Sequence, residues 1–251
     1  MNKKILIVLT RYKGGVGRVT NSIKPLLEKA GYDVKIISRE DDLNCYSLKS
    51  SFKILRNKVK SIKYDILYTQ DWSIALPLLD FKNHYVCFHG IEPKNTFLQQ
   101  IVYQIKKDNT IVVGDKLKWK YPRATMIYNG VDFNKFKDLK KNRKYLGWIK
   151  RDYEEWNEKD VTEYAKKNGY KLSVIENLAP EKMNEWYNSL KVFISYPKSF
   201  AGFNLCWLEA LAAGVPLVKG NNNGIGINNV RINYNNMTWE NHVKKLLKVL
   251  K

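Results

Sequence analysis

The chain has 251 residues, of which 44% are apolar and 13% aromatic, so it can bury a core and is not expected to be disordered. Its formal net charge of +20 favours an anionic partner such as nucleic acid, an acidic membrane surface or a phosphorylated ligand, although a compositional bias explains it equally well. No apolar run is long enough to span a membrane, and residues 5–9 lack the pattern of a signal peptide.

Three cysteines lie far apart in the sequence, at Cys45, Cys87 and Cys206. Their spacing fits neither a disulfide framework nor a metal site. A reducing, cytoplasmic location is therefore expected.

The first half of the chain alternates strand and helix signals. Short apolar runs, typical of buried strands, occur at residues 4–9, 34–37, 66–68, 85–88, 110–113 and 125–128. Segments with helical spacing lie between most of them, including residues 19–30 and 49–63. This alternation predicts a parallel sheet covered by helices on both faces.

The alternation resumes after a polar, Lys-rich stretch at residues 135–144. Strands are predicted at residues 144–148, 171–175, 192–195 and 216–218, and a helix is predicted after Ala179 with Pro180 in its first turn. The chain is thus predicted to be an α/β protein with a first domain at residues 1–138 and a second at residues 139–236. Residues 237–251 are expected to form a helix that can cross back to the first domain.

A glycine-rich segment, Lys13-Gly14-Gly15-Val16-Gly17-Arg18-Val19-Thr20, follows the first strand and opens a helix. It is similar to the phosphate loop of the chromosome-partitioning ATPases, but Arg18 replaces the phosphate-binding lysine and Val19 the magnesium-binding threonine. A simple tight turn is a second interpretation. A loop beside donor phosphates is the third, and the motifs further along the chain favour it.

Two strands of the first half end in polar motifs. Residues 85–88 lead into His89-Gly90, and residues 125–128 lead into Asn129-Gly130-Val131-Asp132. Ligand-binding groups in open α/β sheets lie at the carboxyl ends of strands, so His89 is a candidate site residue. A histidine merely bonded to the backbone is the structural alternative.

A third segment joins a strand, a glycine turn and an apolar helix, at residues 190–218. The first N–H groups of such a helix are free, so Phe203, Asn204 and Leu205 could hold a diphosphate. Glu209 lies among apolar helix residues, where a buried carboxylate needs hydrogen-bond partners. A solvent-facing or salt-bridged Glu209 is the alternative.

In this order, the three segments resemble the retaining family 4 glycosyltransferases, and the resemblance extends over residues 14–227. It implies the GT-B fold, with two Rossmann-like parallel-sheet domains facing a cleft, the second one reduced. It also implies transfer of a sugar from a nucleoside-diphosphate donor to a glycan, lipid or protein acceptor. Retention at the anomeric carbon is implied, with no metal or other cofactor, and nucleic acid is not an expected partner.

The resemblance assigns a role to each matching residue. His89 would contact the donor sugar, Glu209 would bind the ribose hydroxyls, and Lys150 or Arg151 would supply the cation that stabilises the leaving diphosphate. The other donor-binding residues lie in three loops: Gly14 and Gly15 by the phosphates, Gly202, Phe203, Asn204 and Leu205 at the diphosphate, and Asn177 and Leu178 near the nucleobase.

Two departures from the family pattern open a second interpretation. Ala201 replaces the first of two paired glutamates, and Trp148 stands where the family has an arginine. A catalytically weakened nucleotide-sugar-binding protein is therefore the main alternative function, and the ATPase is the other. The acidic pair Asp41-Asp42 is expected in a solvated loop.

Basic residues cluster in the first domain beside apolar ones. Lys53, Arg56, Lys60 and Lys63 have helical spacing next to an apolar stripe, and residues 116–121 form a second basic and aromatic cluster. Each cation near an anionic leaflet contributes about 1 kcal/mol, so a peripheral membrane location is predicted as an alternative to a solvated helix face.

Overall fold

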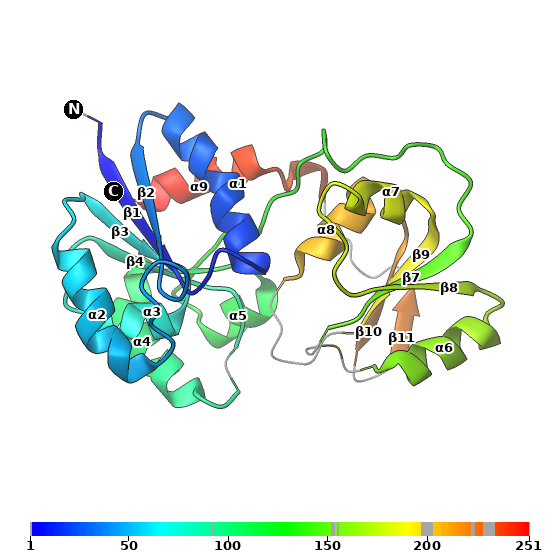
Figure 1. The fold of residues 1–251 in the computed structure, drawn as a ribbon, viewed down its shortest axis with the longest axis horizontal. Helices are drawn as coiled ribbons and strands as arrows, with labels where there is room; N and C mark the ends of the chain where they lie inside the picture. Colours follow the sequence, from blue (N-terminus) through cyan, green and yellow to red (C-terminus); the bar gives the residue numbers. More distant parts are fainter. Residues whose placement is uncertain are drawn as a thin grey trace. The chain divides into compact units, whose positions relative to one another are not determined.

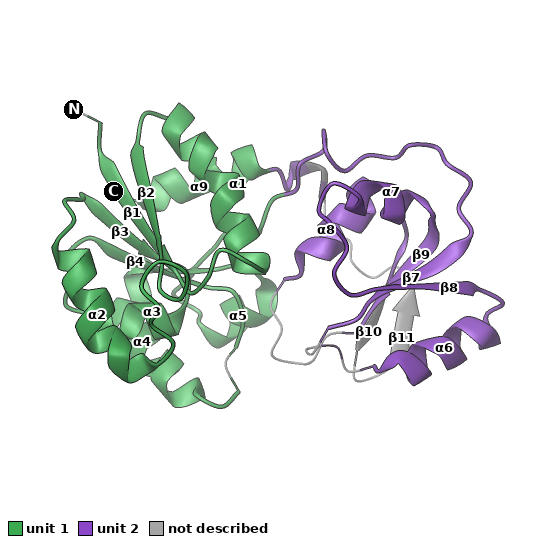
Figure 2. Cartoon of the chain, in the orientation of Figure 1, with its two compact units in different colours: residues 1–130, 239–251 green, residues 131–238 purple. Residues whose placement is uncertain are grey.

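The structure is a computed structural model that describes residues 2–91, 93–151, 154, 156–196, 203–221, 224–227 and 234–250. The chain divides into two compact units, Met1–Gly130 with Trp239–Lys251, and Val131–Thr238 (Figure 2). Within the described ranges, no helix has the length and apolar character needed to cross a membrane.

The described residues of the first unit form a six-stranded parallel sheet in the order β2-β1-β3-β4-β5-β6 (Figure 1). Its strands are β1 (Lys4–Leu9), β2 (Asp33–Ser38), β3 (Ile66–Thr69), β4 (His84–Phe88), β5 (Thr110–Val112) and β6 (Thr125–Met126). Its helices are α1 (Gly15–Lys29), α2 (Leu48–Lys60), α3 (Trp72–Ala75), α4 (Thr96–Lys106), α5 (Asp115–Lys120) and α9 (Trp239–Val249), with 3-10 turns η1 (Leu76–Leu78) and η2 (Lys107–Asn109).

Both faces of this sheet are buried. Leu6 and Val8 of β1 pack in a cluster that includes Leu55 of α2. Successive strand residues point to opposite faces, and the alternate residues Ile5 and Ile7 are also buried, on the face that α1 covers. Helix α9 packs against α1 (Figure 1), so the last segment of the chain completes the first unit.

The described residues of the second unit form a five-stranded sheet in the order β11-β10-β9-β7-β8, parallel except for β11. Its strands are β7 (Tyr145–Ile149), β8 (Lys171–Ile175), β9 (Leu190–Ser195), β10 (Leu217–Asn221) and β11 (Gly224–Ile227). Its helices are α6 (Glu158–Lys167), α7 (Met183–Asn188) and α8 (Leu205–Ala212), with the 3-10 turn η3 (Tyr234–Asn236).

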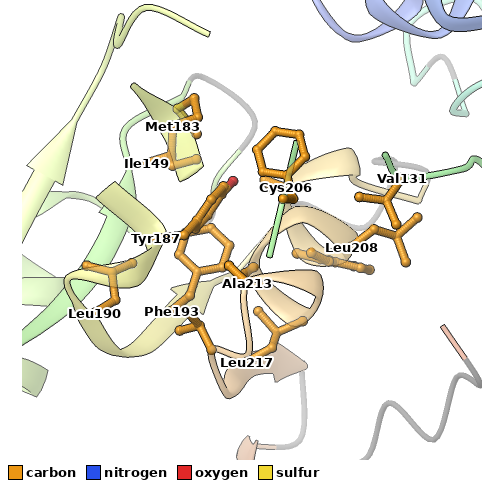
Figure 3. Close-up of a cluster of buried hydrophobic side chains, with 14 residues drawn as sticks. Val131, Ile149, Met183, Tyr187, Leu190, Phe193, Cys206, Leu208, Ala213 and Leu217 are labelled. Carbon is orange, nitrogen blue, oxygen red and sulfur yellow. The ribbon is translucent and has the colours of Figure 1, made fainter. Parts of the chain in front are cut away.

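Two apolar clusters cover the two faces of the second sheet. On one face, Ile149 and Phe193 pack with residues of α7 and α8 (Figure 3). On the other, Leu146 and Trp148 pack against Val161 of α6. Along β7, even-numbered side chains therefore face α6, and odd-numbered ones face α7 and α8.

The predicted fold class, an α/β chain with two parallel sheets, is what the structure shows. The junction lies at Gly130, earlier than the expected residue 138, because the following segment packs on the second unit. There the Leu139 backbone N–H donates to Asn188 Oδ1 (2.7 Å), and Arg143 pairs with Asp138 (3.0 Å). Helix α7 begins at Met183, after the turn that contains Pro180.

Candidate functional site

Strand order points to one edge of each sheet. Chain connections leave in opposite directions where β1 lies beside both β2 and β3, and where β7 lies beside both β8 and β9. In open α/β sheets, ligands bind outside the carboxyl ends of the strands at such switch points. In the first unit these ends lead into the glycine loop and Gln70, and in the second they lead into Lys150 and Tyr196.

The glycine loop after β1 is a close-packed strand-to-helix turn. Gly14 has a φ of 91° and caps α1, which begins at Gly15. A Cβ on Gly17 would lie 1.8 Å from the carbonyl oxygen of Tyr12, so only glycine fits there. Asp42, in the expected solvated loop, is exposed, yet it accepts hydrogen bonds from the Tyr12 hydroxyl (2.7 Å) and the Ser38 N–H (2.8 Å).

His89 directly follows β4, at the strand end where it was expected. Its Nε2 lies 2.7 Å from Oε1 of the buried Gln70, which follows β3. An amide oxygen only accepts, so this contact places the proton of His89 on Nε2. Burial lowers the pKa of His89 to about 4, and a charge on His242 would lower it further. The ring is therefore neutral at pH 7.

His242 of α9 belongs to the same unit and was not singled out in the sequence. Its Nδ1 lies 2.8 Å from the carbonyl oxygen of Tyr128, which follows β6 and directly precedes the Asn-Gly motif. Only 3% of its surface is exposed, and its Nε2 has no hydrogen-bond partner among the described residues. Burial lowers the pKa of His242 to about 4, and the charge of Lys245 acts in the same direction.

In the second unit, alternation along β7 separates the two candidate cations. Lys150 extends the even-numbered side and pairs with Glu158 at the start of α6 (3.4 Å). Arg151 extends the odd-numbered side, and its guanidinium donates to Cys206 Sγ of α8 (3.3 Å). Trp148 is buried on the α6 face. Trp148 and Lys150 therefore lie on the α6 side of the sheet, and Arg151 is the residue that contacts α8.

Glu209 is buried within α8, with only 6% of its surface exposed. The hydroxyl of Tyr187 in α7 donates to its Oε2 (3.0 Å), which supplies a partner that a buried carboxylate requires. Glu154 lies nearby, and its carboxylate accepts from the Ser195 hydroxyl (3.1 Å) and the Tyr196 N–H (2.6 Å) at the end of β9. Burial raises the pKa of Glu154, whereas these hydrogen bonds and the charge of Arg151 lower it.

The N-terminus of α8 has the features of an anion site. Asn204 caps the helix without a side-chain hydrogen bond, and no acidic residue lies in the first turn. The buried Nδ2 of Asn204 has no hydrogen-bond partner in the described part of the chain. With the first N–H groups of the helix, this amide and Arg151 can surround a phosphate oxygen.

The other expected donor-binding residues are dispersed around the second unit. Phe203 packs on the cluster that contains Trp207, and Leu178 packs on the same cluster. Asn177 is exposed in the loop after β8. Gly202, like Ala201, lies outside the described residues.

Three residues that complete these arrangements were not predicted as site residues. Gln70 could have been found from its place at the end of β3, by the rule that selected His89. Tyr187 has the helical spacing of a core residue, and nothing in the sequence pairs it with Glu209. His242 lies more than 100 residues from its partner Tyr128, so only the folded chain shows the contact.

No protein-family model and no curated protein matches this sequence, but solved structures do. AviGT4, a glycosyltransferase involved in avilamycin A biosynthesis, matches 99% of this chain and 97% of its own, at 8% identity and a TM-score of 0.65. Sucrose-phosphate synthase from Thermosynechococcus elongatus matches 87% and 81% (11% identity, TM-score 0.63). Anabaena HepE, solved with UDP-glucose, matches 86% and 80% (15% identity, TM-score 0.59). The chain therefore has the GT-B fold of these glycosyltransferases.

Proposed function

We propose that this protein is a glycosyltransferase that moves a sugar from a nucleoside diphosphate to an acceptor, with retention at the anomeric carbon. The arrangement around α8 carries this proposal. Arg151 contacts Cys206 in the first turn of the helix, and Glu209 lies one turn further along. A cation, the N-terminal N–H groups of a helix and a held carboxylate are the groups that bind a diphosphate and a ribose. The fold shared with HepE, which was solved with UDP-glucose, supports it.

In the proposed reaction, the bond between the anomeric carbon and the diphosphate oxygen breaks, and the diphosphate keeps the electron pair. Arg151 and the N-terminus of α8 stabilise the charge that develops on it. The acceptor oxygen bonds to the anomeric carbon on the same face and passes its proton to the departing phosphate. Neutral His89 contacts the sugar. We propose that no metal ion or cofactor takes part, so EDTA should leave turnover unchanged.

A panel of nucleotide sugars, with ATP alongside, tests this function. A bound donor raises the midpoint of thermal unfolding by mass action, so at least one nucleotide sugar should stabilise the protein more than ATP does. Mass spectrometry then detects transfer to sugar or lipid acceptors, and NMR of the product gives its anomeric configuration. Stabilisation by ATP alone would favour the ATPase interpretation of the glycine loop, and an inverted product would refute retention.

A nucleotide-sugar-binding protein without turnover is the second candidate. It is favoured by Trp148, which stands at the position where the resembled family has an arginine. The Trp148 side chain packs in the apolar cluster on the α6 face. It predicts stabilisation by a nucleotide sugar with neither transfer nor hydrolysis. Release of free nucleoside diphosphate over time, with a catalyst-free control, decides between the two functions.

We further propose a peripheral membrane location through α2. Phe52 and Ile54 are exposed beside the exposed Lys53 and Lys60. Arg56, part of the predicted basic face, pairs instead with Asp80, so its reversal would also disturb folding. K53E/K60E should therefore release the protein from anionic vesicles at low salt. If the wild type stays in the supernatant with those vesicles, the membrane proposal fails.

A further inference from the structure

We propose that His242 is a ligand-binding residue whose Nε2 accepts a hydrogen bond from a sugar hydroxyl. The site lies at the strand ends of the first unit, where His242 holds Tyr128 after β6 and His89 follows β4. The identification of the ligand as a sugar rests on the proposed function. The geometry of the buried imidazole does not depend on it.

The contact with Tyr128 fixes the protonation of His242. A carbonyl oxygen only accepts, so the Nδ1 that lies 2.8 Å from it must carry a proton. Because the ring is neutral at pH 7, Nε2 then has a lone pair and no hydrogen. His242 therefore presents a pure acceptor on its other side.

This acceptor is buried without a partner in the described residues. Buried polar groups are nearly always hydrogen-bonded, and an exception calls for a missing partner. The missing group must donate, which excludes phosphate and carboxylate oxygens. A sugar hydroxyl donates to one group while it accepts from others, and water is the competing donor.

The surroundings of His242 favour a neutral ligand. Trp239, one turn earlier in α9, lies edge-on to the imidazole with ring centroids 5.6 Å apart, and hydrophobic and aromatic side chains are the usual lining of small-molecule sites. His89 is close enough for electrostatic coupling, yet its proton is held on Nε2 by Gln70. Neither ring is charged at pH 7, so hydroxyl binding meets no repulsion between them.

Long-range ¹H–¹⁵N NMR of the histidines tests the proposal on the full-length protein. The chain has three histidines, so H242F identifies the signals of His242. At pH 7 the spectrum should show the tautomer with the proton on Nδ1. Methyl glucoside, methyl galactoside, methyl mannoside and the nucleotide sugar selected by the panel serve as probes. UDP, which keeps the ribose but lacks the transferred sugar, is the control.

At least one sugar probe should move the Nε2 signal of His242, and UDP should not. H242F should weaken that sugar at least tenfold, whereas H242Q, whose amide oxygen still accepts, should stay within about threefold. A proton on Nε2, or no shift with any sugar, overturns the proposal and indicates that water fills the site. If UDP binding persists in that case, the proposed function stands. If nucleotides fail to bind but sugars still move the signal, only the proposed function falls.

Discussion

Replacing Tyr187 with Phe should destabilise the second unit through Glu209. The hydroxyl donates 3.0 Å to a buried carboxylate, and hydrogen bonds to charged groups contribute roughly 1.5–3 kcal/mol. The aromatic ring itself stays in place, edge-on to Phe193 with centroids 5.7 Å apart, so the substitution opens no large cavity. We therefore expect Y187F to lower the free energy of unfolding by about 1.5–3 kcal/mol.

A double-mutant cycle with E209L separates this interaction from general damage. When both partners become apolar, no carboxylate is left underbonded, so Y187F should cost less than about 0.5 kcal/mol in the E209L background. Urea denaturation measures both values through the tryptophans of the second unit: Trp148, Trp156, Trp186 and Trp207. Y164F, a half-buried tyrosine beside Trp156, is the matched control. Equal costs of Y187F in both backgrounds would refute the reasoning.

R151A should weaken nucleoside-diphosphate binding about 10- to 100-fold, measured by calorimetry, because a charge-assisted phosphate contact is lost; K150A, on the opposite face, should not, and equal losses would contradict the assignment. G17A should lower the thermal midpoint, because its Cβ would lie 1.8 Å from a carbonyl oxygen, whereas G15A adds a Cβ into open space and should not. Acidification from pH 6.5 to 4 should destabilise the first unit, because three histidines bind protons in this range mainly when unfolded, each contributing up to about 1.4 kcal/mol per pH unit. These are the buried His84 and His242 and the half-buried His89, with folded pKa values of about 3, 4 and 4. Asp71, whose pKa is raised to about 6, binds its proton in the folded state and so offsets the effect of one histidine. Denaturation midpoints that do not change with pH would contradict this expectation.

The alternation of strands and helices could be read from the sequence because buried parallel strands are short apolar runs. β1 and β8 have the predicted bounds, and β4 begins one residue early, at His84. The buried His84 was not predicted as a strand residue because it is polar, and its ring is satisfied by Thr69 (2.9 Å) and the Leu78 carbonyl (3.0 Å). The antiparallel pairing of β11 with β10 had no signal in its glycine-rich sequence.

Some site residues could be located from local sequence patterns, and others only from tertiary contacts. His89 follows a strand and Asn204 precedes a helix, and Glu209 is a carboxylate among the apolar residues of that helix. Sequence patterns locate all three. The choice between Lys150 and Arg151 as the candidate cation could not be made from the sequence. It depends on which side chains of β7 face α6, and the structure shows this. Only the folded chain shows that His242 contacts Tyr128, whereas the place of Gln70 at the end of β3 was accessible to the strand-end rule.

The return of α9 to the first unit has a consequence for biosynthesis. The second unit is an insertion whose two ends are held together, since the Val131 N–H donates to the Met237 carbonyl (2.8 Å) and Val131 bridges Thr238. Ribosomes add about 5–20 residues per second, so α9 emerges on the order of 10 s or more after α1, against which it packs. Until then the face of α1 that α9 packs against stays open to solvent or chaperones. The inserted unit can therefore finish folding before the unit that surrounds it in the sequence.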